Sequence, residues 1–99
     1  MAEGDGQIVL GLEKDIVAAE SENVKTAIKE VMSDGMSSLV LDLDKVEQVD
    51  SVGMGVLIAA YNSLKKKDVE FKLINVSQNL YDLFQIMRLN KHFEIEVKE

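Results

Sequence analysis

The sequence predicts an α/β fold in which short strands alternate with amphipathic helices and form a mostly parallel or mixed sheet of about four to five strands. Two observations carry this prediction: apolar runs of strand length recur along the chain, and the segments between them carry apolar residues at helical spacing. The chain has 99 residues, of which 46% are hydrophobic and 29% are charged, a length and a balance that match one globular domain. We therefore expect a single domain over residues 1–99, with residues 1–7 as a disordered tail.

The first strand is predicted over residues 8–12, where IVLGL forms a short apolar run. A helix follows, and Ser21 can cap it, because a serine oxygen accepts a hydrogen bond from a free N–H at a helix N-terminus. The apolar residues of this helix recur at helical spacing and predict one buried stripe of Val24, Ala27, Ile28, Val31 and Met32. Asp34 and Gly35 predict its end.

A second strand is predicted over residues 38–43, and Asp44 and Lys45 form a turn after it. The second helix is predicted from Val52 to about Lys67, because apolar residues recur there at helical spacing. These residues are Val56, Leu57, Ala60, Tyr61 and Leu64. Three consecutive lysines, residues 65–67, end the helix, where positive charge suits the helix dipole.

The remaining elements are a third strand over residues 69–76, a third helix within residues 77–90 and a last strand around residues 93–97. The third helix has one apolar stripe, and Asn90 predicts its end. The stripe consists of Leu80, Leu83, Phe84 and Met87. Because strands and helices alternate along the whole chain, we expect right-handed crossovers and a largely parallel sheet covered by helices.

Composition excludes several classes of partner and of chemistry. Eleven basic residues against 18 acidic residues give a net charge of −7, which repels nucleic acid and anionic lipid surfaces alike. The absence of cysteine excludes disulfides and thiol catalysis. The acidic first residues do not resemble a signal peptide, and no apolar run approaches the roughly 18 residues of a membrane span. We expect a cytoplasmic protein without nucleic-acid binding or membrane insertion.

The segment VDSVGMGVLIAAY, residues 49–61, is the strongest candidate for a functional site. It lies where a strand leads into a helix, a usual place for ligand and partner sites in α/β sheets. Either Asp50 or Ser51 can cap the helix. Gly53 and Gly55 each weaken the first turn by about 1 kcal/mol relative to alanine. They also leave Ser51 uncovered, and a phosphate there would meet free N–H groups and the positive end of the helix dipole.

Other chemistries have less support in the sequence. Gly53 and Gly55 begin a dinucleotide-binding motif, but Ile58 stands where its third glycine would be, and no phosphate-binding loop with its lysine occurs. His92 is the single histidine, and nothing marks it as a base for Ser51. Asp42 and Asp44 share one strand face and offer a Mg²⁺-dependent phosphoacceptor site as an alternative. We therefore expect neither an enzyme nor a resident metal or cofactor.

Residues 39–95 resemble the STAS domain of the anti-sigma factor antagonists, in which a hydrophobic strand precedes a D-S-x-G-x-G motif that opens a helix. The later segment LNKHFEI is similar to the helix-to-strand junction of that family. The resemblance implies that Ser51 is phosphorylated by a partner that is both anti-sigma factor and serine protein kinase, and that a separate phosphatase resets it. It also implies a partner-binding surface made of Asp50, Ser51, Val52, Gly53, Met54 and Gly55.

The chain departs from this family in two places. KDIV, residues 14–17, stands where the family has a G-[DE]-[LI]-D motif, so that Lys14 replaces the glycine and Val17 replaces the second aspartate. The chain is also short before Ile8, so the family's leading strand is expected to be absent. These departures keep a second interpretation open, a non-phosphorylated STAS scaffold or adaptor in a signalling, chemotaxis or lipid-transport complex.

Overall fold

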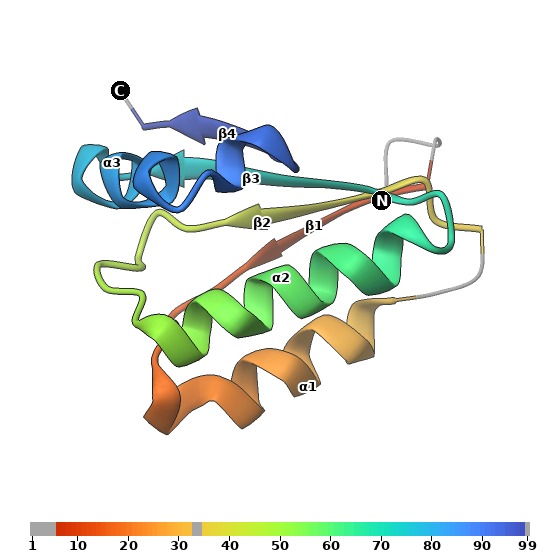
Figure 1. The fold of residues 1–99 in the computed structure, drawn as a ribbon. Helices are drawn as coiled ribbons and strands as arrows, with labels where there is room; N and C mark the ends of the chain where they lie inside the picture. The colour runs from red at the N-terminus through yellow and green to blue at the C-terminus, as the bar shows by residue number, and fades with distance from the viewer. Residues whose placement is uncertain (1–5, 33–34, 99) are drawn as a thin grey trace.

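The computed structural model describes residues 6–32 and 35–98, and this part of the chain contains alternating strands and helices (Figure 1). The strands are β1 (Gln7–Gly11), β2 (Ser38–Asp42), β3 (Glu70–Val76) and β4 (Glu94–Val97). The α-helices are α1 (Ser21–Val31), α2 (Ser51–Lys65) and α3 (Gln78–Ile86), and the short 3₁₀ turns are η1 (Ala18–Glu20) and η2 (Leu89–Lys91). Strand β1 begins at Gln7, and residues 1–5 of the expected tail lie outside the described residues.

The four described strands form one sheet in the order β1-β2-β3-β4, and every neighbouring pair is parallel. This confirms the predicted α/β fold and decides for a parallel rather than a mixed sheet. Right-handed crossovers that always step in the same direction place the connecting helices on one face of the sheet. Figure 1 shows α1 and α2 side by side along that face.

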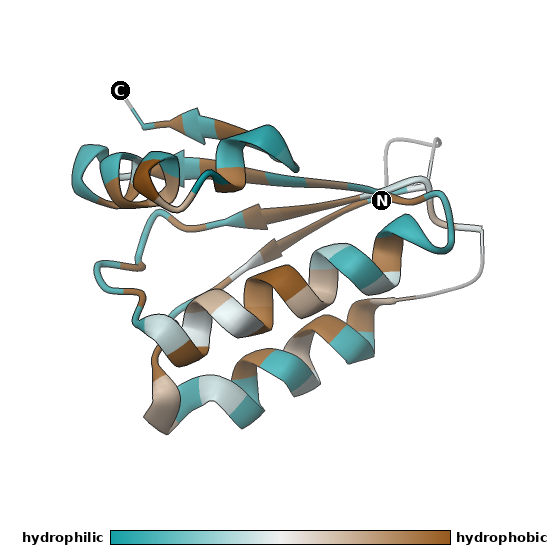
Figure 2. Cartoon of the chain, viewed as in Figure 1, coloured by the Kyte–Doolittle hydropathy of each residue, from teal (hydrophilic) through white to brown (hydrophobic). Residues whose placement is uncertain are grey.

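The hydrophobic core lies between this face of the sheet and the helices. Leu41 in β2, Leu57 in α2 and Phe84 in α3 all have 0% exposure, and brown and teal alternate along α1 as expected for a helix with one buried side (Figure 2). The opposite face of the sheet carries both apolar and charged side chains: Val9, which is 56% exposed, and Val40 lie in register with Lys72. There Lys72 forms ion pairs with Glu94, at 3.8 Å, and with Glu96, at 2.7 Å.

The ends of the first two helices differ from the prediction. Ser21 is not the N-cap of α1; it is the first helical residue, Glu20 occupies the cap position, and the Ser21 hydroxyl donates to the Ala18 carbonyl at 3.0 Å. The preceding turn η1 places Ser21 inside the helix, which sequence spacing alone did not indicate. Helix α1 ends at Val31, and Asp34, predicted to end it, lies outside the described residues. Helix α2 ends at Lys65, two residues before the predicted Lys67.

Helix α3 ends at Ile86, so the prediction that it continues to Asn90 is wrong. Arg88 adopts a left-handed conformation with φ of 63°, which turns the chain out of the helix. As a result Met87, predicted on the buried stripe, is 51% exposed, whereas Leu89 is buried. The turn therefore leaves an apolar side chain on the surface at the end of α3.

Candidate functional site

The D-S-x-G-x-G segment lies at the end of the sheet formed by the C-termini of the parallel strands. Strand β2 ends at Asp42, and the chain then follows a loop to the start of α2 at Ser51. The loop is anchored in the core, because Leu43, Val46 and Val49 are buried. Since these apolar side chains are fixed, the polar residues that follow them are held in defined positions at the surface.

Asp50 caps helix α2 and at the same time binds a second loop. Its Oδ1 accepts a hydrogen bond from the Gly53 N–H at 2.8 Å, and its Oδ2 accepts one from the Ala18 N–H at 3.0 Å. These two bonds, first that of Gly53 and then that of Ala18, hold the pKa of Asp50 below its usual value. Of the two residues that the sequence offers as cap, Asp50 is therefore the one that occupies the position.

The KDIV segment forms the second loop and is tied to the loop that precedes α2. Ile16 donates its N–H to the Gln48 carbonyl at 3.0 Å and accepts from the Asp50 N–H at 3.3 Å. Asp15 Oδ1 accepts from the N–H groups of Glu47, at 2.8 Å, and Gln48, at 3.2 Å. Asp15 thus has a structural role: it holds the loop that presents Asp50 and Ser51.

Only one of the two glycines in the first turns of α2 is required by a close contact. A Cβ atom on Gly53 would lie 1.7 Å from the Ile16 carbonyl oxygen, so the close approach of the KDIV loop requires glycine there. A Cβ atom on Gly55 would meet nothing within 4 Å. Gly55 is exposed, and no contact within the described residues explains why it is not a better helix former.

Ser51 is the first residue of α2 and is exposed. Among the residues that the structure describes, its hydroxyl has no hydrogen-bond partner. The Gly53 N–H, which a serine cap would bind, is already bound by Asp50. The hydroxyl of Ser51 is therefore free to meet a partner or to be modified.

An apolar groove of about 320 Å³ lies beside Ser51, between α2 and the end of α3. Its lining residues are Val49, Asp50, Ser51, Met54, Gly55, Ile58, Leu83 and Met87. Ile58 is 37% exposed and Met87 is 51% exposed, which is unusual for side chains of this size. Leu83 packs against the core from the predicted stripe and also lines this groove, whereas Met87 of the same stripe is exposed. Ile58 was not predicted as a site residue, and its position off the predicted stripe of α2 was the available signal.

The predicted partner surface divides into an exposed and a covered part. Asp50, Ser51, Val52 and Gly55 are exposed, whereas Gly53 lies under the Ile16 carbonyl and Met54 is buried. We refer to the four exposed residues together with Ile58 and Met87 as the Ser51 surface. It combines one free hydroxyl, one carboxylate and an apolar wall.

The other candidate residues do not join the Ser51 surface. Asp42 Oδ1 accepts from the Asn75 amide and from the Asp44 N–H, both at 3.0 Å, and Asp44 forms an ion pair with Lys98 at 3.1 Å. These carboxylates hold the turn after β2. Within residues 6–32 and 35–98, no group of three or more histidine or acidic side chains is arranged to hold a metal ion.

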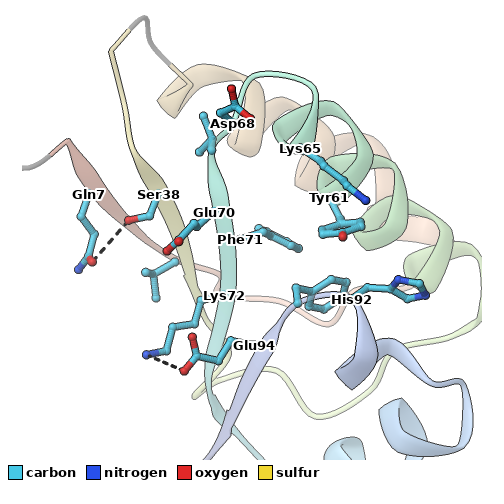
Figure 3. A pocket seen from close by; sticks show the side chains of 13 residues that line it. Gln7, Ser38, Tyr61, Lys65, Asp68, Glu70, Phe71, Lys72, His92 and Glu94 are labelled. Atoms are coloured by element: carbon cyan, nitrogen blue, oxygen red, sulfur yellow. Dashed lines mark hydrogen bonds and ion pairs between the residues drawn. The ribbon is translucent and has the colours of Figure 1, made fainter.

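His92 lies at the N-terminal end of the parallel strands and Ser51 at their C-terminal end, because His92 precedes β4 whereas Ser51 follows β2. It faces Tyr61 with ring centres 5.8 Å apart and lines a hollow of about 530 Å³ (Figure 3). The structure thus separates the histidine from the serine, so the two do not form a nucleophile and base. Among the described helices, none is both long and apolar enough to cross a membrane.

Comparisons with known proteins agree with this architecture. The family profile of the STAS domain matches residues 1–99. An anti-sigma-B factor antagonist of Listeria monocytogenes is 33% identical over 82 residues, which cover 83% of this chain and 72% of the relative.

Two solved structures share the fold. A candidate anti-sigma factor antagonist from Thermotoga maritima superposes with a TM-score of 0.81 at 19% identity, over 90% of this chain and 78% of the other. The unphosphorylated form of the anti-sigma factor antagonist SpoIIAA superposes with a TM-score of 0.63 at 17% identity, over 91% of this chain and 79% of the other. At these identities the likeness concerns the fold alone.

Proposed function

The chain belongs to the STAS domain family, and from this membership we propose that it is an anti-sigma factor antagonist controlled at Ser51. With Ser51 unmodified, the Ser51 surface docks on an anti-sigma factor and so releases the sigma factor for transcription. Phosphorylation of Ser51 ends this binding. The relationship to anti-sigma-B factor antagonists at about one third identity supports the choice of partner.

The observation that carries the proposal is the combination of a free serine hydroxyl with a rigid support. The support consists of the Asp50 carboxylate, which binds both the first turn of α2 and the KDIV loop. A kinase needs an accessible hydroxyl, and a partner needs a surface whose shape is the same in every copy. The Ser51 surface supplies both, and its groove supplies apolar area for binding.

Phosphorylation acts on binding through charge. A phosphoserine carries about −1.5 to −2 at pH 7, and here it would stand beside the Asp50 carboxylate, whose pKa lies below its usual value, so that Asp50 is ionised at pH 7. In the free protein the phosphate remains in water and the fold is unaffected. In the complex both negative groups must lose water, which costs several kcal/mol unless the partner provides cations, and lowers affinity by roughly a hundredfold or more.

Catalysis in this switch belongs to the partners and not to this chain. The anti-sigma factor, as a serine protein kinase of the histidine-kinase-like ATPase type, binds ATP and Mg²⁺. It transfers the γ-phosphoryl group of ATP to the Ser51 oxygen, so that ADP leaves and the hydroxyl proton is released. A separate phosphatase hydrolyses the phosphoserine. All three proteins act in the cytoplasm.

Phosphate mapping tests this assignment. The chain is incubated with the anti-sigma factor kinase of the same organism and ATP, and the modified residue is located by mass spectrometry. We expect one phosphate on Ser51, none on a Ser51→Ala variant, and full modification of a Ser63→Ala variant, because Ser63 is an exposed serine on the same helix. Phosphate on Ser63 or on another serine, with Ser51 unmodified, would refute the proposal.

A non-phosphorylated scaffold is the second candidate, and Val17 is the observation that favours it. Val17 lines a second groove next to Asp50, at the position where the family motif carries an aspartate. An apolar side chain there cannot orient a hydroxyl or a metal-bound nucleotide. The scaffold function is correct if the natural chain and a Val17→Asp variant both bind the kinase but neither accepts phosphate from it.

A further inference from the structure

Another apolar groove, of about 340 Å³, runs between α1 and α2. It lies on the side of α2 that faces away from α3 and is distinct from the grooves beside Ser51 and Val17. Its apolar lining comes from both helices. The lining consists of Ile28 from α1, Met32 directly after α1, and Val56, Ala59 and Ala60 from α2. None of these residues lines the groove beside Ser51, so the two grooves are separate surfaces.

The rim of this groove is positively charged. Lys25 and Lys29 of α1 and Lys67 after α2 line it, and no acidic residue does. This is the reverse of the whole chain, whose net charge is −7 with 11 basic residues against 18 acidic ones. Lys25 also forms an ion pair with Glu22 at 3.2 Å, but both side chains are exposed, so the pair contributes little and is easily exchanged.

The wall formed by α2 is low, because Ala59, Ala60 and Ser63 follow one another along it. Small side chains allow the backbone of an incoming segment to approach closely. A groove between two neighbouring helices accepts the ridge of side chains of a third helix, whose apolar residues at i, i+3, i+4 and i+7 enter it. Its basic rim then meets acidic residues that flank those anchors on the incoming helix.

We propose that the groove between α1 and α2 binds an amphipathic helix of a partner protein in which acidic residues flank the apolar anchors. The occupant is a helix because an open groove covers only one side of its ligand, and an amphipathic helix keeps its own polar side in water. Binding here is independent of Ser51, since the groove lies on another side of α2. The domain can therefore hold a second protein while the Ser51 surface engages or releases the anti-sigma factor.

Two synthetic helical peptides test the proposal on the full chain. Both carry leucine at every third or fourth position; the first has glutamate beside each leucine and the second has lysine. Binding is followed by NMR on ¹⁵N-labelled protein. We expect the acidic peptide to shift the amide signals of Ala59, Ala60 and Lys29 and to bind at least about tenfold more tightly than the basic one, with the difference shrinking at high salt.

Charge-reversed variants test whether the lysines of the rim cause the preference for the acidic peptide. Lys29→Glu combined with Lys67→Glu is expected to lower the affinity for the acidic peptide by at least about tenfold and to raise the affinity for the basic peptide. Lys65→Glu combined with Lys91→Glu changes the net charge equally, away from this groove, and is expected to change both affinities less than about threefold. All four lysines are exposed, so circular dichroism should show an unchanged fold.

Four results would overturn the proposal. The first is equal affinity for both peptides, and the second is a set of shifted signals centred on the Ser51 surface. The third is self-association of the unliganded chain in sedimentation that Ala59→Glu abolishes, because the groove would then belong to a second copy. The fourth is displacement of the acidic peptide by laurate at equal concentration, which would assign the groove to an acyl chain.

Discussion

Replacing Gly53 by alanine tests whether the KDIV loop and α2 are in direct backbone contact. The added Cβ atom would lie 1.7 Å from the Ile16 carbonyl oxygen and 2.6 Å from its carbon, whereas real Cβ contacts stay beyond 3.0 Å. The obstacle is backbone, so no side-chain rotation can relieve it. The loop or the first turn of α2 must therefore move.

The cost of this movement follows from what holds the loop. Ile16 makes two backbone hydrogen bonds across the contact, one with Gln48 and one with Asp50, and each contributes about 0.5–1.5 kcal/mol. Forced overpacking adds roughly 1–3 kcal/mol, and the better helix propensity of alanine returns about 1 kcal/mol. We expect Gly53→Ala to lower the free energy of unfolding by about 2–4 kcal/mol and the melting temperature by more than about 10 °C.

Gly55→Ala is the matched control, because it makes the same chemical change two residues further along the same helix. Nothing lies within 4 Å of its added Cβ atom, so we expect a gain of about 0.5–1 kcal/mol in the free energy of unfolding. Both variants are measured by thermal and urea unfolding followed by circular dichroism. A Gly53→Ala variant as stable as the natural protein, or a Gly55→Ala variant that loses stability, would refute the assignment of the two glycines.

Two further predictions concern residues next to Ser51, and a third concerns nucleotide binding. Val17→Asp should be phosphorylated faster than the natural chain by the anti-sigma factor kinase, as followed by ³²P incorporation; equal rates would show that this departure from the family motif is neutral. Asp50 has a folded pKa below its usual 3.8, so its ionised form stabilises the fold above about pH 4 and this contribution is lost as the pH falls through the folded pKa. The melting temperature of Asp50→Asn should therefore lie below that of the natural protein at pH 7, with the difference shrinking below about pH 4; a constant difference would contradict this role. Finally, the isolated chain should show no saturable ATP binding in calorimetry at sub-millimolar concentration, since it carries no phosphate-binding loop with its lysine.

The order and type of the elements could be predicted from the sequence, because apolar spacing reflects which side of each element is buried. The stripe of α1 is an example: Val24 and Ile28, four residues apart, are both buried. The ends of the helices could not be predicted in the same way. The left-handed turn at Arg88 and the 3₁₀ turn before Ser21 interrupt the helical spacing, and neither has a periodic signal in the sequence.

The candidate site was found by its motif, but its construction was not visible in the sequence. Gly53 and Gly55 look equivalent as letters, yet only Gly53 lies against another segment, the carbonyl of Ile16, 37 residues earlier in the numbering of the chain. The apolar groove beside Ser51 also joins α2 to the end of α3. Such contacts between distant segments follow from the three-dimensional packing and have no periodic signal.

In the proposed switch, one phosphate on Ser51 controls binding without changing the fold. The most direct test is the affinity of the anti-sigma factor of the same organism for the unmodified and the Ser51-phosphorylated chain, measured by calorimetry beside the melting temperature of both forms. We predict that phosphorylation lowers the affinity by roughly a hundredfold or more and leaves the melting temperature within a few degrees, while Ser51→Ala binds like the unmodified chain. Affinities within about threefold of each other, or a fall in melting temperature of about 10 °C or more, would contradict the account.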